Sequence, residues 1–138
     1  GYTHALTHWR KVLSLLDELR LKRNMAVILL AHSKVERFED PESSAYDRYT
    51  PRLHKYATGL ISEWADAVLF ATKRFRVHKE NTGFSGERAI AAPIGAGGGD
   101  RILRTNGGPA CIAKNRYGLP EEIALSWQAF METYGGSR

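Results

Sequence analysis

Two cationic side chains, Lys114 and Arg116, are the strongest candidates for chemistry in this sequence. They follow the uncharged run 110–113 and stand one residue apart, so in an extended strand both side chains point to the same face. Arginine presents a planar fork of donors and lysine a mobile point charge, a combination that suits a polyphosphate whose charge shifts during transfer. The spacing therefore predicts a pair of phosphate ligands at the close of a strand.

The composition is that of one small basic domain spanning residues 1–138. The net charge of +5 favours an anionic partner, and the length is sufficient for one hydrophobic core. The single cysteine, Cys111, excludes an internal disulfide and is expected in the core. No apolar run approaches the length of a membrane span. We expect a soluble cytoplasmic protein with no membrane partner.

Helical and strand patterns alternate in the first half of the chain. Apolar residues spaced three and four apart predict an amphipathic helix over residues 4–23, and an uninterrupted apolar run predicts a strand over 25–31, buried on both faces of a parallel sheet. Thr50 is the expected cap of a second helix over 51–64. A second buried strand over 67–71 would complete a strand-helix-strand unit with parallel neighbours.

Two segments without periodicity are predicted as loops. Residues 33–50 are polar and rich in charges and turn formers, which predicts a long exposed loop. Residues 80–99 end in a glycine-rich run and are predicted to form a flexible hairpin loop. This glycine run is not followed by the Lys and hydroxyl residue of a phosphate-binding P-loop, and it precedes a strand where a P-loop precedes a helix.

The last third of the chain predicts antiparallel structure. Residues 101–105 and 109–113 flank Asn106-Gly107-Gly108, a strong hairpin signal. A short strand over 123–125 is followed by Ser126, which can cap a terminal helix. The predicted fold class is α/β, with parallel strands and flanking helices followed by an antiparallel β-hairpin region.

Four blocks of the sequence resemble the C-terminal half of a RecA-like P-loop ATPase core. The resemblance is closest to phage-encoded RecA-like nucleotide-binding proteins of single-strand annealing recombination, and more distant to DnaB-type replicative helicases. The phage-type match includes the charged loop and the turn Tyr-Gly-Leu-Pro. It implies a partial core that lacks both Walker A and Walker B. The blocks are residues 27–33, 37–55, 63–71 and 113–120.

The resemblance implies an ATP site shared between the subunits of a homo-oligomer. His32, at the end of the first predicted strand, matches a sensor of the γ-phosphate, and Lys114 and Arg116 match a pair that reaches into the ATP of the neighbouring subunit. ATP and Mg²⁺ would be held mostly by a missing N-terminal half of the core. The whole parent protein is then expected to be an ATPase, and these 138 residues alone to be inactive.

The resemblance also implies single-stranded DNA as a partner, in a bacterial host or phage-infected cell. The charged loop occupies the place of a DNA-binding loop, and the basic stretch after residue 72, interleaved with aromatics, could track a nucleic-acid strand. That stretch is equally well explained as a solvated edge strand kept from aggregation by its charges. The candidate DNA ligands are Lys34, Arg37, Arg48, Arg52, Lys55, Arg74 and Arg76.

No metal site is predicted from the histidines. His4 and His8 stand one helical turn apart, but Ala5 occupies the place where a zincin needs its general-base Glu, and no third ligand is evident.

Two other functions stay open at this point. The chain could be a non-enzymatic single-stranded DNA-binding or interaction module, which would bind DNA alone with a steep salt dependence and without regard to ATP. It could also be the remnant of a DnaB-type helicase, which would share the fold and differ in unwinding duplexes.

Overall fold

The computed structural model describes residues 1–81, 87–93 and 100–135, with the backbone alone for 75–81 and 87–93. The chain forms two compact units. Unit 1 comprises Gly1–Val68 and Gly108–Ile112, and unit 2 comprises Leu69–Gly107 and Ala113–Arg138.

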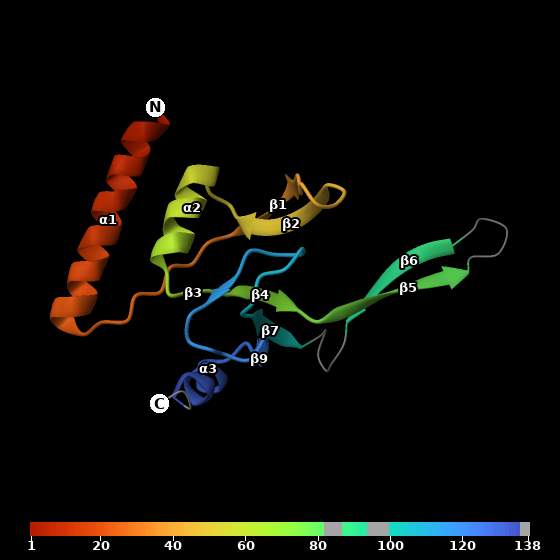
Figure 1. Ribbon diagram of the computed structural model, residues 1–138. Helices are drawn as coiled ribbons and strands as arrows, with labels where there is room; N and C mark the ends of the chain where they lie inside the picture. The colour runs from red at the N-terminus through yellow and green to blue at the C-terminus, as the bar shows by residue number, and fades with distance from the viewer. Residues whose placement is uncertain (82–86, 94–99, 136–138) are drawn as a thin grey trace. The chain divides into compact units, whose positions relative to one another are not determined.

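Unit 1 combines two helices with a β-hairpin (Figure 1). The strands of the hairpin are antiparallel, and the outer edge of the second one pairs in parallel with the segment around Cys111. There the amide of Tyr49 donates to the carbonyl of Ala110 at 2.8 Å, and the amide of Ile112 donates to the carbonyl of Tyr49 at 3.1 Å. The elements are α1 (Tyr2–Arg23), β1 (Ser33–Phe38), β2 (Tyr46–Pro51), α2 (Lys55–Trp64) and β3 (Ala67–Val68).

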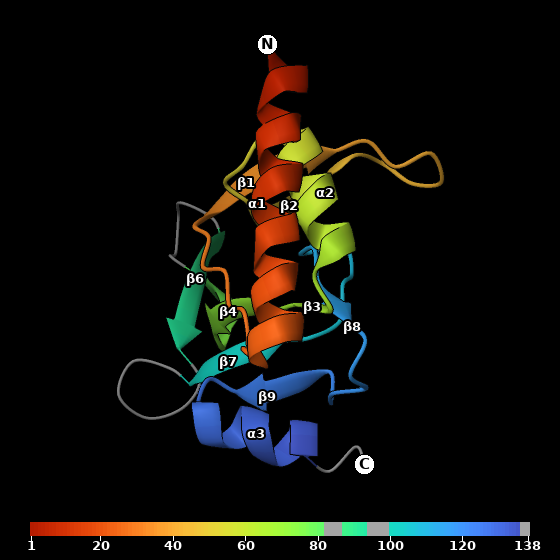
Figure 2. The ribbon, with the colours of Figure 1, turned by 90° about the vertical axis from the view of Figure 1, so that its left-hand side faces the viewer.

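The helix predicted at the start of the chain is confirmed as α1. It ends at Asn24, which adopts the left-handed conformation (φ 52°) that asparagine tolerates better than most residues. Figures 1 and 2 show α1 alongside α2, and Leu13 is buried on α1. The indole Nε1 of Trp64 on α2 donates to the Asp17 carboxylate on α1 at 3.0 Å. A buried leucine and one interhelical hydrogen bond therefore hold the pair together.

The strand predicted over residues 25–31 is wrong. Residues 24–32 belong to no helix or strand, and Leu30 is 94% exposed although the run is almost wholly apolar. A strand is stabilised by hydrogen-bonded neighbours, and the described residues supply none for this run. The apolar pattern is typical of a central strand, but a run without neighbouring strands cannot form a strand. The predicted strand-helix-strand unit is therefore not present.

This exposure predicts a sharp contrast between two leucines. Leu30→Ser should change the free energy of unfolding by less than about 0.5 kcal/mol, because the side chain has little packing to lose. Leu13→Ala, at a position only 4% exposed, should cost about 2–5 kcal/mol. Urea unfolding of the 138-residue chain measures both values. An equal loss for both variants would show that Leu30 is packed in solution.

The segment over 33–50, predicted as a loop, instead forms most of the β1–β2 hairpin. Its register pairs Lys34 with Thr50 near the base and Phe38 with Tyr46 near the tip. The following helix also begins later than predicted, because Thr50 lies within β2, where it is buried, and His54 caps α2 by accepting a hydrogen bond from the Tyr56 amide at its ring. β-branched and aromatic residues on the two arms favour the hairpin over the loop.

Unit 2 is built on a three-stranded antiparallel sheet in the order β4-β7-β9. Its core contains Ile102, Leu119 and Ile123, each at most 7% exposed. Figure 1 shows α3 beside β9 and a separate antiparallel pair formed by β5 and β6. The elements are β4 (Phe70–Lys73), β5 (Phe75–Asn81), β6 (Glu87–Pro93), β7 (Arg101–Arg104), β8 (Lys114–Asn115), β9 (Glu122–Ala124) and α3 (Trp127–Gly135).

The terminal strand and helix are confirmed in unit 2. β9 overlaps the strand predicted over 123–125, and the Ser126 hydroxyl accepts a hydrogen bond from the Ala129 amide at 3.0 Å, as expected of a helix cap. The strand predicted over 67–71 is divided between β3 and β4.

The remaining pairing predictions for unit 2 are wrong. The hairpin predicted between 101–105 and 109–113 does not form, because β7 pairs with β4 and β9 on its two sides, and residues 110–112 pair with Tyr49 in unit 1. Within the loop predicted over 80–99, residues 87–93 form β6; the glycine run lies outside the described residues. The fold is α/β in its mixture of helices and small sheets, and these sheets are antiparallel where a parallel core was expected.

Among the residues that the structure describes, no helix combines the length and the apolar character needed to cross a bilayer.

Candidate functional site

The cationic pair predicted from the sequence lies in unit 2, where β8 runs into a turn. Lys114 belongs to β8 and is half-buried, whereas Arg116 is in the turn and exposed. Gly118 closes the turn with φ +65°, a left-handed conformation that glycine adopts without a steric cost. Only Lys114 lies within a strand, so the alternation that predicted one shared face for the two cations does not extend to Arg116.

Asn115, between the two cations, ties this turn together through its side-chain amide. Its Nδ2 group donates to the carbonyl of Leu119 at 2.8 Å, and its Oδ1 atom accepts from the amide of Leu119 at 3.0 Å. One side chain thereby satisfies both backbone polar groups of a residue that is 5% exposed.

Thr105 anchors the same turn to the end of β7. Its side chain is completely buried, and its hydroxyl donates to the carbonyl of Pro120 at 2.6 Å. The Nδ2 atom of Asn115 lies 3.4 Å from the Thr105 hydroxyl oxygen, and the amide of Thr105 donates to the carbonyl of Glu121 at 3.0 Å. We call Thr105, Asn115 and Leu119 the turn clamp.

Sequence reasoning missed Asn115 and Thr105 as parts of the site. The available signal was an asparagine three residues before a glycine at the end of a strand, because asparagine side chains often bond to nearby backbone groups in turns. Thr105 gave no comparable signal, since its partners lie about fifteen residues away in the sequence.

The sensor candidate His32 lies in unit 1, one residue before β1, and is exposed. Its carbonyl accepts a hydrogen bond from the amide of Arg52 at 2.6 Å, at the base of the hairpin. Because the run before it is not a strand, the argument that placed His32 at the end of a parallel strand no longer applies. Its role as a γ-phosphate sensor stays a prediction.

The DNA-binding candidates of the hairpin are partly neutralised by its own acids. Lys34 lies 3.5 Å from the Glu36 carboxylate and Arg37 lies 3.7 Å from that of Asp47. The guanidinium of Arg48 lies 3.9 Å from the centre of the Phe38 ring. Arg52 and Lys55 are exposed just beyond the base of the hairpin.

The tip of the hairpin is acidic. Asp40 accepts hydrogen bonds from the Glu42 amide at 2.9 Å and from the Ser43 hydroxyl at 2.8 Å. These two contacts, the amide first, lower the pKa of Asp40, because both stabilise the ionised carboxylate. A phosphate backbone would therefore be repelled at the tip and attracted only at the base.

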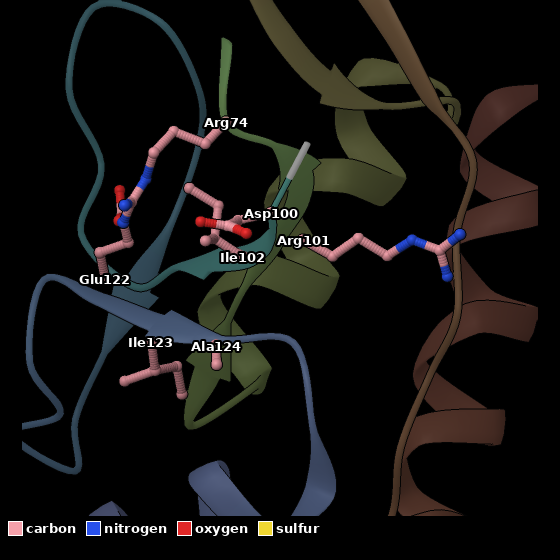
Figure 3. A pocket seen from close by; sticks show the side chains of 7 residues that line it. All are labelled: Arg74, Asp100, Arg101, Ile102, Glu122, Ile123 and Ala124. Atoms are coloured by element: carbon pink, nitrogen blue, oxygen red, sulfur yellow. The ribbon is translucent and has the colours of Figure 1, made fainter. Parts of the chain in front are cut away.

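A pocket of about 260 Å³ in unit 2 involves another DNA-binding candidate, Arg74 (Figure 3). Arg74 forms an ion pair with Glu122, and Figure 3 shows the two side chains meeting at one side of the pocket while Arg101 points away. Two arginines are balanced by Asp100 and Glu122, so the pocket has no net charge with which to bind a triphosphate. Arg76 is in β5, where the structure describes only the backbone.

The histidine pair lies on α1, with the two Nε2 atoms of His4 and His8 3.0 Å apart. Within the described ranges, no three His, Cys, Asp or Glu side chains are grouped as a metal site would require.

Taken together, the described residues include two cations that could contact a phosphate group but no loop that would bind one. Lys114 and Arg116 can neutralise charge on a phosphoryl group, which is the role that such side chains play in phosphoryl transfer. The sequence contains no P-loop that would hold the nucleotide itself.

Comparison with known proteins identifies the family. A family model described as an AAA domain matches residues 1–117, which is most of the chain and includes both cations of the turn. Neither the curated proteins nor the solved structures give a match. The match supports an ATP-binding domain of the P-loop type, and the chain belongs to the AAA domain family.

Proposed function

We propose that this chain is the C-terminal part of a phage-type, RecA-like ATPase that acts on single-stranded DNA in recombination or annealing. One observation carries the proposal: the family match reaches Tyr117 and includes Lys114 and Arg116, although the sequence has no P-loop. The two cations lie on an ordered turn, but this sequence has no phosphate-binding loop beside them. Such an arrangement suits an ATP site in which another chain supplies that loop.

In this proposal the ATP site lies between two subunits of a homo-oligomer. Residues outside the 138 hold ATP and Mg²⁺, and His32 senses the γ-phosphate. Lys114 and Arg116 enter the site of the neighbouring subunit, where the guanidinium fork and the ammonium group offset charge on the transferring phosphoryl. ATP turnover then depends on assembly, because a separated subunit has no neighbour to supply Lys114 and Arg116 to its ATP site.

The experiment that tests the proposal measures ATP turnover by the intact ATPase with and without single-stranded DNA. We expect DNA to raise turnover by about tenfold or more, since binding of single-stranded DNA by the oligomer would close the ATP sites between its subunits. The isolated 138 residues should show no turnover under either condition, because they lack a P-loop.

Measurements of DNA binding and of duplex unwinding on the same protein separate the two alternatives. Strand binding without any turnover by the intact protein would favour the non-enzymatic binding module. Turnover coupled to duplex unwinding would favour the DnaB-type helicase.

A further inference from the structure

We infer that Asn115 is the positioning residue for Lys114 and Arg116, acting through the turn clamp. This inference rests on the proposed function, because it explains how the two cations of the proposed ATP site are held in position. Asn115 itself is expected to touch no nucleotide, since both polar atoms of its side chain already bond within the turn.

The first step of the argument is direction. In an extended segment, successive side chains point to opposite faces. The side chain of Asn115 points toward Leu119 and Thr105, as its hydrogen bonds show. Lys114, one residue earlier in β8, therefore projects to the other face, and Arg116 follows in the turn that the asparagine closes. Fixing the asparagine fixes the face on which Lys114 is presented and the start of the turn that carries Arg116.

The second step is chemical specificity. The clamp needs a donor for the Leu119 carbonyl and an acceptor for the Leu119 amide on one short side chain. An ionised aspartate keeps the acceptor and lacks the donor, and glutamine places both groups one methylene too far. Of these three side chains, only asparagine meets both requirements.

The third step is rigidity. Asn115 Nδ2 also lies 3.4 Å from both the buried Thr105 hydroxyl and the Oδ1 atom of Asn106, so the turn is tied to the end of β7. Lysine and arginine side chains lose conformational entropy when they are ordered on a ligand. A backbone fixed in advance limits that loss to the side chains. Without the clamp, the cations would still be present but displaced, and small displacements of catalytic groups reduce turnover strongly.

The test uses the intact ATPase with three single variants, one double variant and one control variant. Asn115→Ala is expected to lower kcat about 10-fold to 100-fold and to change KM for ATP by less than about twofold. The kcat of Asn115→Asp, which keeps the acceptor, should lie between that of wild type and that of Asn115→Ala. This variant provides a second measurement if the alanine variant folds poorly. Arg116→Ala reports on the proposed function itself. The double variant combines Asn115→Ala with Arg116→Ala.

The double variant distinguishes positioning from general stability. If Asn115 acts through the cations, Asn115→Ala should lower turnover by a clearly smaller factor when Arg116 is already alanine than in the wild type, because only the contribution of Lys114 is left to lose. Ile123→Val, which trims a core residue of the same unit that is not part of the turn clamp, is the matched control and should keep turnover near wild type while lowering the melting temperature.

The outcomes separate the two claims. Wild-type turnover in Asn115→Ala together with a loss in Arg116→Ala would overturn the positioning role and leave the proposed function standing. Unchanged turnover in Arg116→Ala would overturn both. Independent, multiplying losses in the double variant would show that Asn115 does not act through Arg116 and would also overturn the inference.

Discussion

Replacing Arg116 by alanine is expected to lower the ATP turnover of the intact ATPase by about 10³-fold, the lower end of what such arginines contribute. ATP binding should stay within about twofold of wild type, because the cation acts mainly on charge that develops during transfer. Steady-state turnover and nucleotide binding, measured on the same preparation, give the two quantities. Arg10→Ala, at an exposed cation of α1 in the other unit, is the matched control and should be silent.

Mixing subunits shows whether Arg116 acts on the neighbouring site. Under the proposed function, an Arg116→Ala subunit of the intact protein keeps the phosphate-binding loop that lies outside the 138 residues, and a subunit with that loop inactivated keeps its Arg116. In a random equal mixture, about a quarter of the interfaces combine an intact loop with an intact arginine, so turnover should recover to about a quarter of wild type. Failure to recover in co-assembled oligomers would place Arg116 in its own subunit's site, and wild-type turnover in Arg116→Ala alone would remove it from catalysis.

The parts of the fold that were predictable from sequence are those set by local chemistry. The helix α1, its stop at Asn24 and the Ser126 cap depend on residues within a few positions of one another. The cationic pair was likewise visible in the sequence as a local pattern of two charges after an apolar run, and its role at a phosphate stays a prediction. Asn115 stands between the two cations, but its part in the turn clamp depends on bonds to Leu119 and Thr105 that no spacing rule predicts.

The parts that were not predictable depend on partners. An apolar run such as 25–31 becomes a strand only beside other strands, and in this chain it has no such neighbour among the described residues. The hairpin over 33–50 was missed for the opposite reason, since its charged faces conceal the cross-strand pairing of Val35 with Tyr49 and Phe38 with Tyr46. Both wrong predictions, the strand over 25–31 and the loop over 33–50, therefore concern strand pairing that is not visible in the local sequence.

The same hairpin determines where DNA should bind. Residues 33–52 contain four cations and five carboxylates, so the hairpin as a whole does not attract a phosphate backbone. Its charge is divided, with an ionised Asp40 at the tip and Arg52 and Lys55 just beyond the base. If single-stranded DNA contacts unit 1, the base is the place that electrostatics favours.

The variant Arg52→Ala/Lys55→Ala is accordingly expected to weaken single-stranded DNA binding by about 25-fold at about 0.1 M salt, and to lower the slope of log K against log salt by about 1.4 for two lost phosphate contacts. Fluorescence anisotropy of a labelled oligothymidine, titrated at several salt concentrations, measures both.

The matched control for this pair is Lys34→Ala/Arg37→Ala, in which the removed cations lie close to Glu36 and Asp47. Since these charges are already compensated, the control should weaken binding by less than about threefold. Asp40→Asn should strengthen binding, because it removes a charge that repels phosphate. Equal losses in the two double variants would mean that DNA displaces the hairpin's own ion pairs, and an unchanged salt slope in Arg52→Ala/Lys55→Ala would place the DNA contact elsewhere in the chain.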